Sequence, residues 1–200
     1  TRFRRHFLFL KPDVIVVYDE LEAREPVAWT WLLHSHNRMA RAGENAVAAS
    51  NGVAEGRMEL FTSGELTLNL TDRFFSPAIN WKKRTGPDGR VQEYVNHWHA
   101  EFTTAVKSRA QRFLAVFRIT PEGRKPLALK GGAKGRVTVG GWSVSAELDA
   151  SKPATLSVTD RRGNAVLYNT PASETAGSTV VRRRGEPARE LVDVVPASVR

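Results

Sequence analysis

The sequence predicts an all-β protein built as an antiparallel β-sandwich. Short runs rich in β-branched and aromatic residues alternate along the chain with turns rich in Pro, Gly, Asn and Asp. Residues 14–17 form an uninterrupted apolar run, which is typical of a strand covered on both faces. No segment shows the periodicity of an amphipathic helix of three turns, and no internal repeat is visible.

Three strands are expected in the first thirty-six residues, at 3–10, 14–18 and 28–34. Lys11-Pro12-Asp13 has the composition of a turn between the first two. The acidic stretch 20–25, closed by Pro26, is expected to connect the second strand to the third. Residues 37–45 are polar and are expected to form a loop.

The middle of the chain continues the strand pattern. Asn51-Gly52 is a strong two-residue hairpin signal. Residues 73–90 are expected to be irregular and to end in the turn Gly86-Pro87-Asp88-Gly89. Further strands are expected at residues 46–50, 53–61, 66–70, 95–106 and 112–119.

The expected strand 95–106 alternates most regularly. Because side chains alternate across a strand, Trp98, Ala100 and Phe102 share one face, and His97 and His99 share the other. The aromatic face is expected to enter the core, with the imidazoles outward or in a cleft. The residues expected to be largely buried are Trp29, Trp31, Trp98, Phe102, Phe113 and Phe117.

Beyond Thr120, turns rich in glycine separate shorter runs. Short strands at this spacing predict a smaller β-layer that completes the sandwich, or a small β-subdomain. The expected organisation is therefore a main sandwich over residues 1–120, additional strands over 121–181 and a tail over 182–200. The short strands are expected at residues 127–129, 136–139, 142–148, 155–159, 166–168 and 179–181.

The composition restricts the class of partner. The chain has 200 residues and a formal net charge of +9, which favours anionic partners such as acidic polysaccharide. A basic surface that only keeps the protein soluble is the alternative. No nucleic-acid-binding signature accompanies the charge, no apolar run is long enough for a membrane helix, and the absence of cysteine excludes thiolate metal sites. We therefore expect neither nucleic acid nor membrane as a partner.

The opening residues also resemble a known family. The order FLKPDVIVVYDELEA, then WTWLLHS, then NHWHAEF and RFLAVFRI is similar to the C-terminal β-sandwich region of heparinase II/III-like polysaccharide lyases. The resemblance covers residues 2–121. It implies an enzyme in which a helical α/α-toroid precedes the sandwich and which cleaves uronic-acid-containing polysaccharide, such as glycosaminoglycan or alginate, by β-elimination.

The resemblance also implies the setting of the chain. The upstream α/α-toroid of the same polypeptide would be a partner, and the bacterial enzyme would be periplasmic or secreted. Since the chain begins almost inside a strand and without a signal peptide, a fragment that is inactive by itself is expected. No catalytic residue, metal ligand or cofactor is assigned to this fragment, although a divalent metal would be compatible with the intact enzyme. A non-catalytic carbohydrate-binding or structural module is the alternative.

Four histidines are candidate substrate contacts: His34, His36, His97 and His99. Two imidazoles at i and i+2 on a strand point the same way, an arrangement that suits either a metal or a carboxylate. In the family, the catalytic and zinc-linked His-x-His pair lies upstream of this region, so that role is not transferred to His34 and His36. Structural histidines at a strand end are the alternative.

Basic residues that follow the expected strand 95–106 are the other candidates. Lys107, Arg109 and Arg112 begin a stretch with many cations and one acid, Glu122. Lysine and arginine bind carboxylate and sulfate through charge-assisted hydrogen bonds. These cations form either one basic face that contacts acidic polysaccharide or a scattered set on several loops.

Overall fold

The computed structural model describes residues 1–73, 83–93, 97–173 and 175–192. These residues form antiparallel strands and one short 3-10 helix, which confirms the all-β antiparallel class. The elements are β1 (Arg2–Leu10), β2 (Val14–Val27), β3 (Thr30–Ser35), β4 (Met39–Gly43), β5 (Ala46–Ser50), β6 (Ala54–Phe61), β7 (Leu66–Thr71), β8 (Lys83–Thr85), β9 (Val91–Glu93), β10 (Trp98–Thr104), β11 (Ser108–Pro121), β12 (Leu129–Gly131), η1 (Ala133–Gly135), β13 (Arg136–Val139), β14 (Trp142–Ala146), β15 (Leu156–Asp160), β16 (Ala165–Tyr168), β17 (Thr179–Arg182) and β18 (Arg189–Leu191).

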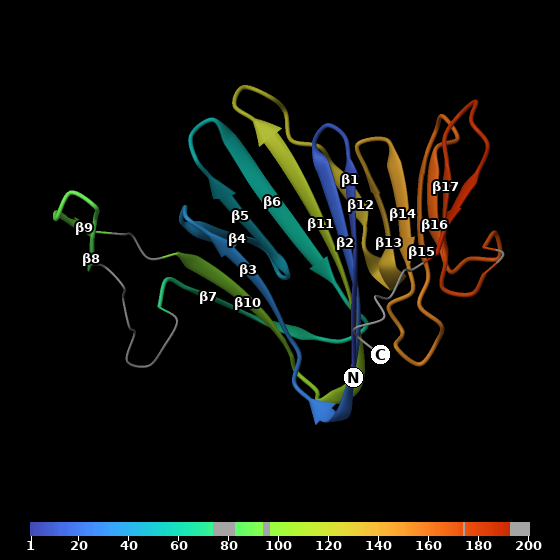
Figure 1. Ribbon diagram of the computed structural model, residues 1–200, viewed down its shortest axis with the longest axis horizontal. Coiled ribbons are helices and arrows are strands. Elements are labelled where there is room, and N and C mark those ends of the chain that lie inside the picture. The colour runs from blue at the N-terminus through green and yellow to red at the C-terminus, as the bar shows by residue number, and fades with distance from the viewer. Residues whose placement is uncertain (74–82, 94–96, 174, 193–200) are drawn as a thin grey trace.

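The strands stack in three layers (Figure 1). The middle sheet has six strands in the order β1-β2-β11-β6-β5-β4. A three-stranded sheet, β3-β10-β7, covers one of its faces, and a seven-stranded sheet, β12 to β18 in chain order, covers the other. Strands β8 and β9 form a separate hairpin around the predicted turn, where Gly89 N donates to Gly86 O.

Strand β2 of the middle sheet is buried on both faces, as the apolar run 14–17 predicts. Val14, Val16 and Tyr18 of β2 face the seven-stranded sheet and join one hydrophobic cluster. Val17 and Leu21 face the three-stranded sheet and join a second cluster. Each face of β2 therefore contributes side chains to a different hydrophobic core, so this one strand is shared by both cores.

The aromatic residues expected in the core divide into two groups. Trp31, Phe102 and Phe113 are at most 6% exposed and lie between the middle and three-stranded sheets. Trp29, Trp98 and Phe117 are only half-buried. Trp29 precedes β3 and Trp98 begins β10, so each lies at an end of the three-stranded sheet, where fewer neighbours cover it.

Two expectations about connections are wrong. The acidic stretch 20–25 is not a connector, because β2 continues through it to Val27. Its first carboxylates lie on a paired strand and find cationic partners, so charge does not end the strand. Residues 37–45 contain β4, whose Met39 is 3% exposed and packs in the second core. That strand has a single strongly apolar residue, which explains why its sequence resembles a loop.

The strands after Thr120 form one continuous meander in a single sheet. Each pairs with the next in the chain, from β12 to β18. Strand β18 lies inside the segment expected to be a tail and pairs with β17, while residues 193–200 lie outside the described residues. Among the described residues, no helix is long and apolar enough to cross a membrane.

Candidate functional site

The four candidate histidines gather on the outer face of the three-stranded sheet. β3 and β10 pair with His34 opposite His99, and the same register places His36 beside His97. Trp31 and Phe102 in this ladder face the core, so side chains of the opposite parity face away from the middle sheet. The predicted division of β10 into an aromatic and an imidazole face is confirmed.

The imidazoles form two contacting pairs. The ring centroids of His34 and His99 are 4.3 Å apart, and those of His36 and His97 are 4.0 Å apart. His99 is 7% exposed because it lies on the central strand, whereas the other three are exposed. Burial lowers the pKa of His99, and the charges of His34 and His97 act in the same direction.

Other polar groups border this histidine surface. The Arg38 guanidinium lies 5.7 Å from the centre of a Trp98 ring. Asn69 of β7 donates from Nδ2 to Oε2 of Glu101 at 3.0 Å, and the charge of Glu101 raises the pKa of His99 against the lowering by burial. Within the described ranges, no group of three or more His, Cys, Asp or Glu side chains could hold a metal ion. Asn96, which precedes His97, lies outside the described residues.

The three candidate cations do not share one exposed face. Lys107 and Arg109 are exposed at the start of β11, where Arg109 Nη2 lies 3.3 Å from Glu25 Oε2. Arg112 is only 4% exposed and points between the middle and seven-stranded sheets. All three are remote from the histidines, which lie at the other end of β10. Alternation along β11 separates them, since Arg112 has the parity of core residues Leu114 and Val116.

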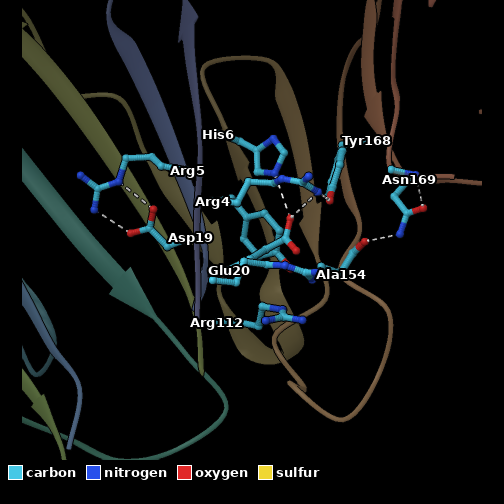
Figure 2. Close-up of polar contacts among 12 residues, drawn as sticks. Arg4, Arg5, His6, Asp19, Glu20, Arg112, Ala154, Tyr168 and Asn169 are labelled. Atoms are coloured by element: carbon cyan, nitrogen blue, oxygen red, sulfur yellow. Dashed lines mark hydrogen bonds and ion pairs between the residues drawn. The ribbon is translucent and has the colours of Figure 1, made fainter. Parts of the chain in front are cut away.

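A second polar site, which the sequence reasoning missed, lies between the middle and seven-stranded sheets (Figure 2). Glu20 of β2 accepts a hydrogen bond from His6 Nε2 at 3.1 Å, and Arg4 Nη1 lies 4.0 Å from the same carboxylate oxygen. Arg4 also donates to the Tyr168 hydroxyl at 2.6 Å. The His6 ring packs against Tyr168 with centroids 4.1 Å apart. The network thus joins β1 and β2 to β16 of the opposite layer.

Burial and hydrogen bonding change the proton affinities in this Glu20 network. Burial by itself raises the pKa of the Glu20 carboxyl, but hydrogen bonds from His6 and Tyr168 outweigh it and hold that pKa below its ordinary value. Burial, and then the hydrogen bond to Glu20, raise the pKa of Tyr168. Burial likewise raises the pKa of Tyr18, whose hydroxyl donates to Glu147 O at 2.7 Å. Glu20 is therefore an anion, and both tyrosines are neutral, at neutral pH.

A cleft of about 660 Å³ opens beside this network. Cations and carboxylates of β1, β2 and β11 form one wall, and the loops after β14 and β16 form the other. The sequence does contain a signal for it. Arg2, Arg4 and His6 alternate with aromatic residues along β1, and two of them pair with the acids of β2, Arg2 opposite Glu22 and Arg4 opposite Glu20. Reading the acidic stretch as a connector concealed this ladder.

Asp19 is next to Glu20 in β2, but its side chain points to the other face of the middle sheet, toward the three-stranded sheet. Arg5 donates from Nε and Nη2 to its two oxygens at 2.7 and 2.8 Å, and Trp31 Nε1 donates at 2.8 Å. Two adjacent acids thus tie the middle sheet to each outer sheet. They contribute to the architecture as well as to the surface chemistry.

Comparison with known proteins adds no relative: no protein-family model matches this chain, and no curated protein matches it.

Proposed function

We propose that this chain is the β-sandwich part of a polysaccharide lyase that cleaves uronic-acid-containing polysaccharide by β-elimination. In this proposal, the histidine surface of the three-stranded sheet contacts the acidic polymer. The gathering of His34, His36, His97 and His99 on one outer face carries the proposal, because residues 61 and 65 positions apart in the chain meet there. Imidazole N–H groups donate to carboxylate oxygens, and histidine ordinarily gains a positive charge below about pH 6.5.

An exposed aromatic strip on β1 supports the bracing role. Phe3, Phe7 and Phe9 are 68%, 64% and 50% exposed on a strand at the edge of the middle sheet. Exposed apolar side chains in a row are typical of an interaction surface. We assign this strip to contact with the α/α-toroid that the family resemblance places upstream in the same polypeptide.

The chemistry of the lyase is assigned to the intact enzyme. β-Elimination removes the C5 proton of a uronic acid and expels the sugar linked at O4, which requires a base and a donor that stabilises the enolate. In the family, most of that set comes from the toroid and the upstream sandwich. The isolated chain is therefore expected to bind the polymer without cleaving it.

Affinity electrophoresis in alginate or heparin gels tests the binding. At about pH 5.5, where histidine is mostly protonated, the wild-type chain should be retarded, and His36→Gln/His97→Gln should be retarded much less. Arg161→Gln/Arg162→Gln is the matched control, because it removes two exposed charges from the β15–β16 turn. If both double variants weaken the retardation equally, the binding depends on the net charge of the chain and not on the histidine surface. Formation of the ultraviolet-absorbing unsaturated uronate by the isolated chain would show that it is itself a lyase.

The alternative is a non-catalytic carbohydrate-binding or structural module. The use of Asp19 and Glu20 in contacts between sheets, with Trp31 and Tyr168, favours it. The coding sequence upstream of Thr1 separates the two functions. The lyase proposal expects an upstream α/α-toroid in the same reading frame, whereas an upstream sequence that encodes no toroid would support the module.

A further inference from the structure

The cleft between the middle and seven-stranded sheets has the size of a small-molecule site. Its volume of about 660 Å³ falls within the range of about 300–1,000 Å³ that is usual for ligand pockets. It lies on the opposite side of the middle sheet from the histidine surface, so it is a separate place on the molecule. Its polar lining includes Arg2, Arg4, Glu20, Arg112, Lys152 and Tyr168.

Arg112 is the unusual member of this lining. It is 4% exposed, yet no carboxylate of the described residues lies within 4 Å of its guanidinium, and its Nε has no hydrogen-bond partner. Its Nη1 lies 3.5 Å from the carbonyl oxygen of Gln111, and a hydrogen bond from the guanidinium to the Tyr18 hydroxyl lowers the pKa of Tyr18 against the effect of burial. These neutral partners do not balance the charge of Arg112, so an arriving anion would be bound strongly there.

The acids of the cleft are directed to other partners. Glu20 stands opposite Arg112 in the β2–β11 ladder, but its carboxylate meets His6 (Figure 2). Glu22 pairs with Arg2 at 3.2 Å. Arg4 lies beside Glu20, and Lys152 of the lining lies 3.2 Å from Asp149. Arg112 is therefore the cation of the lining that has no carboxylate within 4 Å among the described residues.

The far wall of the cleft is held in place before any ligand arrives. Asn169 donates from Nδ2 to Ala154 O at 2.8 Å and accepts from Gly177 N at 3.0 Å. These bonds join the loops after β14, β16 and the segment before β17, which form the rim. A rim that is already ordered keeps the entropic cost of binding low.

We propose that this cleft binds a sugar acid of one or two rings, with its carboxylate on the Arg112 guanidinium. A guanidinium binds a carboxylate through two parallel hydrogen bonds, which favours a planar carboxylate over a simple spherical anion. Glu22, Ser151 and Tyr168 supply partners for sugar hydroxyls along the same walls. This site goes beyond the proposed function, since its ligand follows from the lining alone and it needs neither a polymer nor the lyase reaction.

Calorimetric titration of the whole chain with glucuronate, glucose and sulfate tests the site. Glucuronate should bind, glucose should give no heat, and sulfate should bind at least about tenfold more weakly because it lacks the planar pair of oxygens. Arg112→Met should lower the affinity for glucuronate at least about tenfold. It should also leave the urea midpoint of the ligand-free protein unchanged or raised, since an unpaired buried charge is removed.

Ala176→Trp is the second variant, because Ala176 is exposed at the cleft and belongs to no polar contact described above. It should abolish glucuronate binding without moving the urea midpoint, whereas Arg161→Met, on a distant exposed turn, should change neither. The proposal is overturned if glucuronate gives no heat with the wild-type chain, or if sulfate binds as tightly. It is also overturned if Ala176→Trp binds normally while Arg112→Met is destabilised, which would make Arg112 structural. His36→Gln/His97→Gln should leave glucuronate binding intact, so this site can fail independently of the polymer surface.

Discussion

Replacing Asp19 by Ala is expected to lower the free energy of unfolding by about 2–5 kcal/mol. The carboxylate is 1% exposed and accepts two hydrogen bonds from Arg5 and one from Trp31. The indole N–H of Trp31 would be left buried without an acceptor, which costs about 1–3 kcal/mol. Arg5 is 44% exposed and can turn into water, so its loss adds only about 1–2 kcal/mol.

Urea unfolding of a small set of variants separates these contributions. Asp19→Asn retains an acceptor for Trp31 and should cost about half as much as Asp19→Ala. Arg5→Ala should also be clearly destabilising, because it leaves the buried Asp19 carboxylate without its cation. A double-mutant cycle between Asp19→Ala and Trp31→Phe should show a coupling of about 1–3 kcal/mol, because the indole N–H is lost together with its acceptor. If Asp19→Ala unfolds within about 0.5 kcal/mol of the parent, or if the double-mutant cycle shows no coupling, the reasoning is refuted.

Three further predictions concern the core, pH and backbone. Phe113→Ala should cost about 3–5 kcal/mol in urea unfolding, and the half-buried Trp98→Ala clearly less; equal costs would contradict the burial difference. Because the folded pKa of Glu20 is below its unfolded value near 4.3, its contribution to stability is complete above about pH 4.3 and is lost as pH falls through the folded pKa. Glu20→Gln should therefore flatten the acid limb of the unfolding free energy, and an unchanged limb would exclude this carboxylate as its source. Gly135 has φ +69° and faces a carbonyl oxygen of β14, whereas Gly52 has φ +87° and open space around it. Gly135→Ala should therefore lower the thermal unfolding temperature more than Gly52→Ala does. The reverse order would refute the close approach at Gly135.

The histidine surface could be predicted in part from the sequence. Alternation along residues 97–102 places the imidazoles of β10 on one face and Trp98, Ala100 and Phe102 on the other, and the structure has that division. Local composition does not show which strand pairs with β10, because that pairing joins segments that are far apart in the chain. His36 and His97 are 61 positions apart in the chain, so the sequence alone does not reveal the contact that the sheet register brings about.

The cleft depended still more on the tertiary structure. Basic residues that are close together in the sequence resemble an exposed basic patch. On that basis, Lys107, Arg109 and Arg112 are expected to share one surface. The β11 pleat and the packing of a third layer separate them, because Arg112 shares the parity of core residues and is covered by the seven-stranded sheet.

Strand class and most strand positions followed from the sequence, because β-branched runs, alternation and turn residues act locally. The apolar run 14–17 also determined that something must cover both faces of β2, since water on either side would leave apolar surface exposed. Only the tertiary structure decided that β2 continues through its acids. A buried carboxylate such as Asp19 or Glu20 is tolerable on a strand only when partners lie within hydrogen-bonding distance. Those partners come from the neighbouring strand β1, as Arg5 and His6 do, and from other sheets, as Trp31 and Tyr168 do.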